Sequence, residues 1–476
     1  MINVFNLLQF DLKIFILSKI CIHMKSVKTL LYTVLLVLFS VCTFAETKKI
    51  GEYEVSLKAS KLDAIYKKGE KADFILSVKK NGKEFSGAKI EYLISKDGVA
   101  PYYRGQKTIG AIEKFSTSLN EAGFIKCKVD IQFPDIKQKL SMLAGAGFSP
   151  LEIQPSLPVP SDFSSYWNVQ KDILKKIPLN INMQLRNNVL VSEKKVSTDV
   201  VNAIDMYIVK ADTFNGKLDA YLTKPKNAKP KSLPAIILPH GAGVKLSRYA
   251  GFFGAAEWAK RGFLAIDFNV LGLDSDAKDK LKEFQKQYRG YAWVNMDNRD
   301  TNFFRTMYLR LCRAMDVAMA QPEWDGKTLV VFGTSQGGAQ ALGAGGLYND
   351  KVTMVCSFVP AICDQTGFVK NRVNGWPHYI KPNKNGIYEN PDMKLAEALR
   401  YIDAMNFASL IKAPTIFVID LADPTCEPTS CFAAFANINA PKILITNPEA
   451  RHSVPRKCYE DVIAKVVEHA KEMSKK

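Results

Sequence analysis

The sequence predicts an α/β protein with a mostly parallel sheet, preceded by a separate all-β segment. Three observations support this fold class: residues 50 to 153 contain short alternating strands, Pro155–Pro160 is a proline-spaced linker, and apolar strands then alternate with helices up to the C-terminus. A chain of 476 residues is too long for one ordinary core. We therefore place a β domain at residues 46–154 and an α/β domain at residues 155–476.

The β segment is predicted from half-buried strands joined by tight turns. Apolar and polar side chains alternate in Ala72–Val78, and Lys80–Lys83 contains the Asn-Gly pair that is typical of a hairpin. Several such strands within about 100 residues favour an immunoglobulin-like sandwich. The segment contains no histidine and its acidic residues are isolated, so we expect no catalytic site there.

The segment after the linker alternates between helices and strands. Continuous apolar runs predict strands that are buried on both faces, as in parallel sheets. A helix capped by Ser161 is expected to run to about Lys176, and the last helix is expected from Tyr459. Strands are expected at 235–238, 263–268, 329–332, 352–358, 415–419 and 442–445, and further helices at 255–261, 301–320 and from Gln336. The boundary also predicts that a chain starting near Leu157 folds by itself.

The first 45 residues have the features of a secretory signal peptide. Met24–Lys28 is basic, Leu30–Phe39 is apolar but too short for a membrane span, and Thr43–Ala45 offers a small-residue cleavage site. The signal is complete from Met24, which is therefore a candidate for the true start of the chain. We expect export to the periplasm or the cell exterior, with no transmembrane segment in the mature chain.

Charge and cysteine content narrow the classes of partner. The formal charge is +18, but no dense basic stripe, zinc-finger spacing or helix-turn-helix motif is present, so we expect no nucleic acid partner. The charge indicates either a plain solvated surface or an anionic neighbourhood such as acidic polysaccharide or lipid headgroups. Seven of the nine cysteines follow the predicted signal, an odd number without metal-ligand spacing. We expect mostly buried free thiols and no metal, with a Cys426–Cys431 bridge as the alternative.

The strongest chemical motif is Gly333-Thr334-Ser335-Gln336-Gly337, between an apolar strand and a helix. A G-x-S-x-G sequence in this position forms a strained turn that lifts the serine hydroxyl clear of the sheet, and the glycines let neighbouring backbone pass. The motif predicts the α/β-hydrolase fold with Ser335 as the nucleophile. The alternative is a glycine-rich turn with an incidental serine.

A serine nucleophile needs a general base and a carboxylate that orients the base. Of the five histidines, His452 follows the last predicted strand and precedes the last helix, where this fold presents its base. The acid is expected between the serine and the histidine in the sequence, and Asp420 and Asp423 both follow the strand at 415–419. We favour Asp423, at the tip of the loop, and expect Asp420 to cap the turn.

Two backbone N–H groups must also bind the oxyanion of the reaction. Gln336, directly after the nucleophile, is expected to supply one of them, and Ala242, in the turn after the strand at 235–238, the other. Aromatic and imidazole side chains are candidates for substrate walls, with a core role as the alternative for each. These are His240, Trp293 and Trp376, with Tyr288 and Tyr291 as further sugar-stacking candidates.

The motifs resemble the acetyl xylan esterase / cephalosporin-C deacetylase group, carbohydrate esterase family seven. Ser335–Gly338 matches the Ser-Gln-Gly-Gly elbow of this family, Asp423–Thr429 is similar to its cysteine-bearing acid loop, and Asp162–Trp167 resembles its entry helix. Pro360–Asp364 is similar to the loop after its elbow. The resemblance covers about residues 158–470 and implies deacetylation of sugars without a metal or organic cofactor.

Three positions depart from the pattern of that family. Asn269–Leu273 stands where the family has Arg-Gly-Gln, Ser453 rather than glutamate follows the histidine, and Ala242 stands where a tyrosine is usual. These changes leave the Ser335, Asp423 and His452 set intact. The acetyl-xylan specificity and the oligomer of the family do not follow for this chain from the resemblance alone.

The sequence therefore predicts a secreted serine carbohydrate esterase that removes small acyl groups, acetyl above all, from sugars or polysaccharides through an acyl-enzyme intermediate. One alternative is another serine hydrolase of the same fold, a broad carboxylesterase or a peptidase, because a fold does not fix the substrate. The second alternative is a non-catalytic glycan-binding protein. The expected partner is a small-molecule or polysaccharide ester, and a homo-oligomer stays open.

Overall fold

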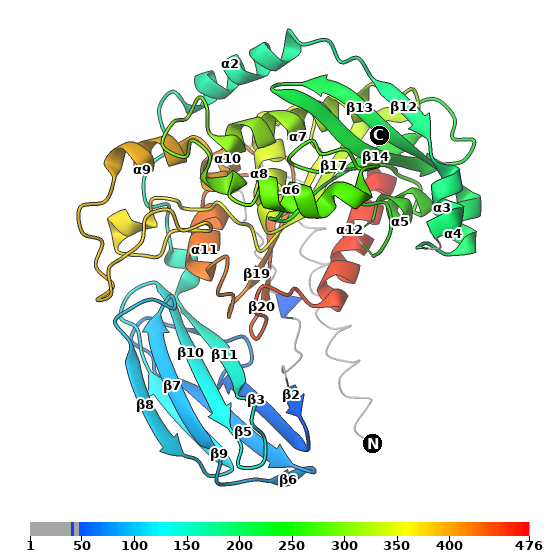
Figure 1. Ribbon diagram of the computed structural model, residues 1–476. Helices are drawn as coiled ribbons and strands as arrows, with labels where there is room; N and C mark the ends of the chain where they lie inside the picture. Colours follow the sequence, from blue (N-terminus) through cyan, green and yellow to red (C-terminus); the bar gives the residue numbers. More distant parts are fainter. Residues whose placement is uncertain (1–39, 42–46, 194, 253, 476) are drawn as a thin grey trace, which may run out of the picture. The chain divides into compact units, whose positions relative to one another are not determined.

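The computed structural model describes residues 40–41, 47–193, 195–252 and 254–475, which all fall within one compact unit spanning residues 37–476 (Figure 1). Most of the predicted signal peptide lies outside the described residues. Its residues Ser40 and Val41 form the short strand β1 (Ser40–Val41), which pairs in parallel with β20 (Lys442–Asn447). Within the described ranges, no helix combines the length and apolar character needed to cross a bilayer.

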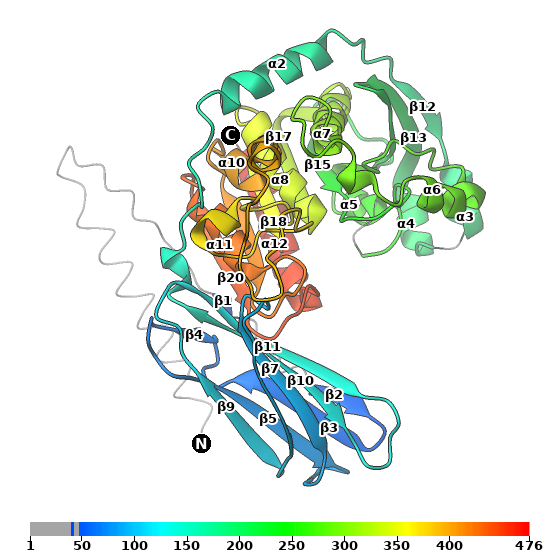
Figure 2. The same cartoon turned by 60° about the vertical axis from the view of Figure 1, so that its left-hand side comes forward.

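Two sheets form the N-terminal part of the described chain (Figure 2). In β5 alternate side chains are buried, as the sequence pattern predicts, and the ring of Tyr53 in β3 stacks on Phe133 after β10 with centroids 3.9 Å apart. The two-sheet arrangement is thus present, while its immunoglobulin-like classification stays a prediction. One sheet contains β2 (Thr47–Ile50), β3 (Tyr53–Ala59), β5 (Ala72–Lys80), β6 (Lys83–Glu84) and β9 (Ile112–Thr117), and the other β4 (Ile65–Tyr66), β11 (Leu140–Phe148), β10 (Gly123–Gln132), β7 (Lys89–Lys96) and β8 (Tyr103–Thr108).

A ten-stranded sheet with the strand order β1-β20-β19-β18-β17-β15-β16-β14-β13-β12 forms the centre of the rest of the chain. Pairing is parallel from β1 to β16 and antiparallel from β16 to β12, so the sheet is mostly parallel, as predicted. Its remaining strands are β12 (Asn182–Leu185), β13 (Ile204–Thr213), β14 (Gly216–Pro225), β15 (Leu233–Pro239), β16 (Leu264–Phe268), β17 (Trp324–Thr334), β18 (Met354–Phe358) and β19 (Thr415–Asp420).

The hairpin of β13 and β14 is absent from the sequence prediction. Thr213 pairs with Gly216, so the connection is a two-residue turn in which Asn215 adopts a φ of 54°. An asparagine followed by glycine between alternating runs is a strong hairpin signal. The Asn215-Gly216 pair therefore indicates this hairpin in the sequence, whereas the alternation of strands and helices does not predict it.

Helices cover both faces of the large sheet (Figure 1). Val330 of β17 shares an apolar cluster with Trp258 of α5 and Val462 of α12, whereas its neighbour Val331 shares another with Met307 of α7 and Leu342 of α8. Successive side chains of a strand point to opposite faces, so β17 is buried on both. The helices are α2 (Phe163–Lys175), α3 (Asn187–Glu193), α4 (Thr198–Ala203), α5 (Ala255–Lys260), α6 (Leu281–Gln287), α7 (Phe303–Met319), α8 (Gln336–Leu347), α9 (Met393–Arg400), α10 (Ala404–Ala408), α11 (Pro428–Ala436) and α12 (Arg456–Ser474).

Two predicted helix starts need correction. Helix α2 takes Asp162 rather than Ser161 as its N-cap, without a side-chain cap bond, because Asp162 binds Tyr401 and Arg299 instead. Helix α12 begins at Arg456 rather than Tyr459, with Pro455 as its N-cap, because its first two residues are exposed and polar and the apolar pattern starts only after them.

Candidate active site

The chain makes a sharp turn at Ser335, between β17 and α8. Ser335 has φ 62° and ψ −121°, a backbone conformation that L-residues rarely adopt. A Cβ atom added at Gly333 would lie 2.1 Å from the carbonyl oxygen of Gly337, and one added at Gly337 would lie 2.3 Å from that of Pro239. The two glycines are therefore required by close backbone approaches, and the strained turn holds the serine hydroxyl at the carboxyl edge of the sheet.

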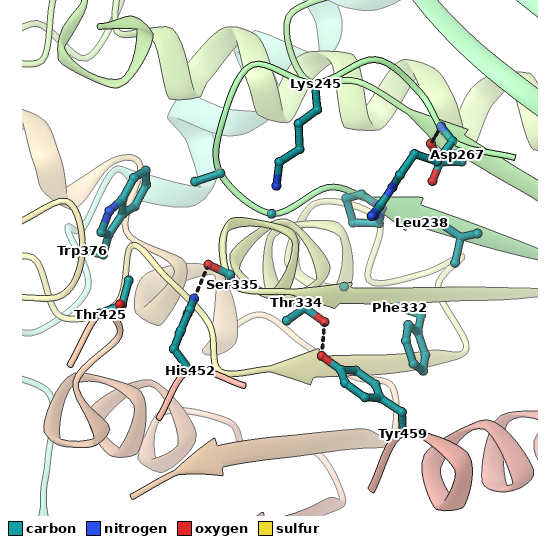
Figure 3. Close-up of a pocket in the computed structure, with 15 residues that line it drawn as sticks. Leu238, Lys245, Asp267, Phe332, Thr334, Ser335, Trp376, Thr425, His452 and Tyr459 are labelled. Atoms are coloured by element: carbon teal, nitrogen blue, oxygen red, sulfur yellow. Dashed lines mark hydrogen bonds between the residues drawn. The ribbon is translucent and has the colours of Figure 1, made fainter. Parts of the chain in front are cut away.

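Ser335, His452 and Asp423 form a continuous hydrogen-bonded set (Figure 3 shows the first bond). The Oγ atom of Ser335 lies 3.1 Å from Nε2 of His452, and Nδ1 of His452 lies 2.6 Å from Oδ2 of Asp423. With Nδ1–H donated to the carboxylate, Nε2 is free to accept the serine proton. The structure thus brings together the three residues that the sequence predicts as catalytic.

Two other histidines in the described part of the chain also pair with carboxylates, but their pairs contain no hydrogen bond to Ser335. His240 lies 2.6 Å from Asp267, and His378 lies 2.8 Å from Glu427. A His–carboxylate pair by itself is therefore no sign of catalysis here. The position of the pair relative to Ser335 distinguishes His452.

The two candidate aspartates have different roles in the structure. Oδ1 of Asp423 accepts the backbone N–H groups of Thr425 and Cys426 at 2.7 and 3.0 Å, which leaves Oδ2 for His452. Asp420 is equally buried, but its Oδ1 accepts the side-chain amide of Asn447 at 2.7 Å. Burial raises the pKa of Asp420 to about 7. The carboxylate in contact with the imidazole is that of Asp423.

The surroundings of His452 set its protonation. Burial lowers the pKa of His452, but the hydrogen bond to Asp423 and the charges of Asp423, Asp420 and Glu427 together outweigh burial, and the net effect raises the pKa above its ordinary value of 6.5. The neutral imidazole is the form that accepts a proton. Activity that depends on this base is therefore present at high pH and is lost as the pH falls through the raised pKa.

The expected oxyanion donors lie on two adjacent segments. Gln336 is the first residue of α8, so its N–H is one of the groups that a helix leaves unpaired at its N-terminus. The turn that contains Ala242 passes beside the nucleophile, since a Cβ atom at Gly241 would lie 3.7 Å from Cβ of Ser335. Ala242 itself lines the cavity in front of Ser335.

Tyr291, which the sequence suggested only as a sugar-stacking candidate, connects these two segments. It is 7% exposed, and its hydroxyl donates to Oε1 of Gln336 at 2.6 Å and accepts the backbone N–H of Gly243 at 3.0 Å. Burial raises the pKa of Tyr291, so the hydroxyl stays neutral and can do both. No motif marks this residue, because its role depends on two partners distant in sequence.

Removing the hydroxyl of Tyr291 is expected to slow catalysis. Tyr291→Phe should lower kcat for 4-nitrophenyl acetate by about tenfold, less than the 10²–10³-fold typical of a lost oxyanion donor, because the donors remain but are held less firmly. Tyr288→Phe, which alters a tyrosine outside the cavity, is the control. An unchanged kcat for Tyr291→Phe would show that the turn holds its position without this bridge.

The cavity in front of Ser335 has a volume of about 420 Å³, within the usual range of ligand pockets. Trp376, a predicted wall, lines it, and the amino group of Lys245 points into it (Figure 3). Its other lining residues are Leu238, Pro239, Gly241, Ala242, Arg248, Asp267, Phe332, Gly333, Thr334, Ser335, Thr425, His452 and Tyr459.

Two other predicted walls do not line this cavity. The His240 side chain is buried and turned toward Asp267, so it supports the turn from behind. Trp293 is 45% exposed and packs edge-on against Tyr379, with ring centroids 4.8 Å apart. Its loop position was visible in the sequence, but the direction of its side chain was not.

Cysteines beside the site remain separate thiols. Cys426 and Cys431 are buried and form no bridge, and Sγ of Cys431 instead faces the carbonyl oxygen of Cys426 at 3.7 Å. The alternative of a Cys426–Cys431 disulfide is thus not realised, whereas the expectation of mostly buried free thiols is confirmed for the described residues. Cys127, Cys312, Cys356, Cys363 and Cys458 are likewise buried thiols.

One group of potential metal ligands coincides with the catalytic set. Donor atoms of Asp423, Cys426 and His452 lie within 4.8 Å of one another. Both ring nitrogens of His452 already have partners, and both carboxylate oxygens of Asp423 accept hydrogen bonds. The group is therefore arranged for proton transfer between a serine and an imidazole.

The parallel sheet, the strained serine turn and the Ser–His–Asp set define an α/β hydrolase of the esterase type. Residues 151–469 match the model of the acetyl xylan esterase (AXE1) family, and the chain belongs to this family. It is accordingly a carboxylic ester hydrolase, and the resemblance noted in the sequence is confirmed.

Relatives agree with this assignment. An acetyl esterase of Xylanibacter ruminicola, Axe7A, is 28% identical over 434 residues, which cover 89% of this chain and 93% of that protein. The acetyl xylan esterase from Paenibacillus sp. R4 superposes with a TM-score of 0.53 at 25% identity, covering 67% of this chain and 98% of its own. Acetyl xylan esterase 1 from Thermoanaerobacterium sp. JW/SL YS485 shares the fold, with a TM-score of 0.53, 22% identity, and coverage of 67% and 97%.

Proposed function

We propose that this chain is an exported esterase that removes acetyl groups from sugars or polysaccharides by a serine mechanism. The observation that carries the proposal is the hydrogen-bonded Ser335–His452–Asp423 set at the strained turn of an acetyl xylan esterase family member. Export is supported by the basic, apolar and small-residue segments before Glu46. An immunoglobulin-like sandwich at 46–154 is supported by its alternating strands and its two sheets.

The geometry supports the following sequence of bond changes. Oγ of Ser335 attacks the acetyl carbonyl carbon while Nε2 of His452 takes the hydroxyl proton, and the N–H groups of Gln336 and Ala242 bind the resulting oxyanion. The intermediate collapses, the C–O bond to the sugar breaks, and His452 gives its proton to the sugar oxygen. A water molecule then loses a proton to His452 and attacks the carbonyl carbon of the acetyl-serine ester. The bond from that carbon to Oγ breaks, His452 returns the proton to Oγ of Ser335, and the acetyl group leaves as acetic acid, which ionises to acetate.

The size of the acyl group tests the proposal. We expect kcat/KM on 4-nitrophenyl esters to fall steeply from acetate to butyrate, because a small pocket excludes longer acyl chains. In a roomy apolar pocket each added methylene would instead gain about 0.8 kcal/mol of binding. Ala242 makes this a sharp test, because an alanine where the family usually has tyrosine leaves space beside the nucleophile. Ser335→Ala, which should abolish turnover and labelling by a phosphonate, is the control. A kcat/KM that rises through butyrate and hexanoate would replace the acetyl esterase with a broad carboxylesterase.

A further inference from the structure

The segment that carries Asp423 packs against the N-terminal β domain. We call residues 421–427, between β19 and α11, the acid loop. A Cβ atom added at Gly145 of β11 would lie 2.1 Å from the carbonyl oxygen of Leu421, so the two backbones are in direct contact. The ring of Phe124 in β10 packs on Phe432 of α11 with centroids 5.4 Å apart. The acid loop and the helix after it are thus in contact with the β domain.

Lys126 of β10 forms the polar contact at the centre of this interface. Its Nζ atom donates to the backbone oxygen of Asp423 at 2.5 Å, and the residue is 3% exposed. A buried ammonium group is unfavourable unless hydrogen bonds and opposite charge compensate it. Asp97 is close enough to interact electrostatically with Lys126, and it accepts the hydroxyl of Thr429 in the first turn of α11. Lys126 and Asp97 are therefore two polar side chains of the β domain that contact the acid loop and the helix after it.

This contact acts on the backbone of the residue that orients the general base. The carboxylate of Asp423 reaches His452 only while the acid loop keeps its conformation, since the same side chain also binds two N–H groups of that loop. A charge-assisted bond to the Asp423 carbonyl restricts rotation of the adjoining peptide. Lys126 lies outside residues 151–469, which the family model matches, so the support comes from a part of the chain beyond the shared esterase domain.

We propose that Lys126 is a positioning residue of the active site. Through it the β domain keeps the Asp423 carboxylate within hydrogen-bond distance of His452. The proposal rests on the proposed role of Asp423 as the residue that orients His452. It assigns the β domain an indirect part in catalysis, through the position of Asp423, instead of treating the domain as a purely separate module.

The test uses the full mature chain with Lys126→Met. We expect kcat on 4-nitrophenyl acetate to fall by about tenfold with KM nearly unchanged, as for a modest misplacement of a catalytic group. The acid limb of the pH profile should move to lower pH, because a looser Asp423 raises the pKa of His452 less. Lys128→Met is the matched control, since Lys128 lies two residues along the same strand, is exposed and pairs with Asp130.

A second variant and a spectroscopic measurement cover the case in which Lys126→Met fails to fold. Lys126→Gln removes the charge but keeps a donor, and the proton resonance of Nδ1 in His452 reports its bond to Asp423 directly. A folded variant with unchanged kcat, pH profile and resonance would overturn the positioning role. If Asp423→Asn is itself fully active, the proposed role of Asp423 fails rather than that of Lys126, so the two failures are distinguishable.

Discussion

Asp423→Asn is expected to lower kcat by about four orders of magnitude with little change in stability. The asparagine amide can still occupy the space of the carboxylate. In one orientation its NH₂ group faces Nδ1 of His452, and in the other its oxygen accepts the Nδ1–H bond but carries no charge. The imidazolium that forms in the transition state then has no counter-charge, and the correct tautomer is no longer favoured. Steady-state kinetics on 4-nitrophenyl acetate, with thermal unfolding as the stability measurement, test this directly.

Asp420→Asn is the matched control in the same segment. Asp420 is buried and faces Asn447, so an amide preserves its size and removes a carboxylate whose pKa burial has raised. We expect kcat within about tenfold of the wild type, since this group does not orient the base. A large loss in Asp420→Asn together with an active Asp423→Asn would transfer the role of the acid to Asp420.

The pH profile gives a second readout for the same pair of variants. Burial lowers the pKa of His452, and the hydrogen bond and charge of Asp423 are the main contributions that raise it. In Asp423→Asn the contribution of that charge disappears, so the remaining activity should persist to lower pH than in the wild type. In Asp420→Asn the shift should be smaller, because Asp420 makes a weaker contribution in the same direction.

The sequence predicted those parts of the fold whose signal is local. Runs such as Leu329–Phe332 and Thr415–Ile419 are apolar throughout, and each became a central strand buried on both faces. The hairpin of β13 and β14 was missed because its burial alternates in one strand and is continuous in the other. The Asn215-Gly216 pair predicts a hairpin turn, but a pattern of alternating strands and helices contains no hairpin at that point.

The same distinction holds for the site. Ser335, His452 and Asp423 follow from a motif and from the order of elements, which the sequence contains. His240 and Trp293 were expected as walls from their loop positions, yet the direction of a side chain depends on partners such as Asp267 and Tyr379. Tyr291 and Lys126 had no motif at all. Their roles arise from contacts between segments that only the folded chain brings together.

Removal of the β domain is the remaining prediction with a large expected effect. A linker of spaced prolines predicts that the chain from Leu157 folds alone, but the contacts of the acid loop favour the opposite outcome. Without the β domain, Phe432 loses the ring of Phe124, the backbone at Leu421 loses its neighbour Gly145, and the Asp423 carbonyl loses Lys126. We expect residues 157–476 to be largely insoluble, or soluble with kcat reduced by at least the loss seen in Lys126→Met.

The effect of losing linker contacts must be separated from the effect of losing the β domain. Ser156 is buried, its N–H donates to Asp364 at 3.1 Å, and its hydroxyl lies 2.7 Å from that of Thr366. A chain that starts at Leu157 therefore breaks contacts within the esterase domain as well. A chain that starts at Pro150 retains Ser156, so a defect shared by both truncated chains is attributable to the β domain.

Comparison with relatives gives a reason to expect either result when the β domain is removed. The acetyl xylan esterase from Paenibacillus sp. R4 is covered over 98% of its length while covering 67% of this chain, so a family member can fold without a counterpart to the rest. The alignment with Axe7A covers 89% of this chain, more than residues 151–476 alone provide, so that relative extends into the β domain. A soluble chain from Pro150 with full kcat on 4-nitrophenyl acetate would show that the β domain is separable. An inactive one, with activity intact in residues 46–476, would show that this chain has come to depend on it, through the contacts behind Asp423.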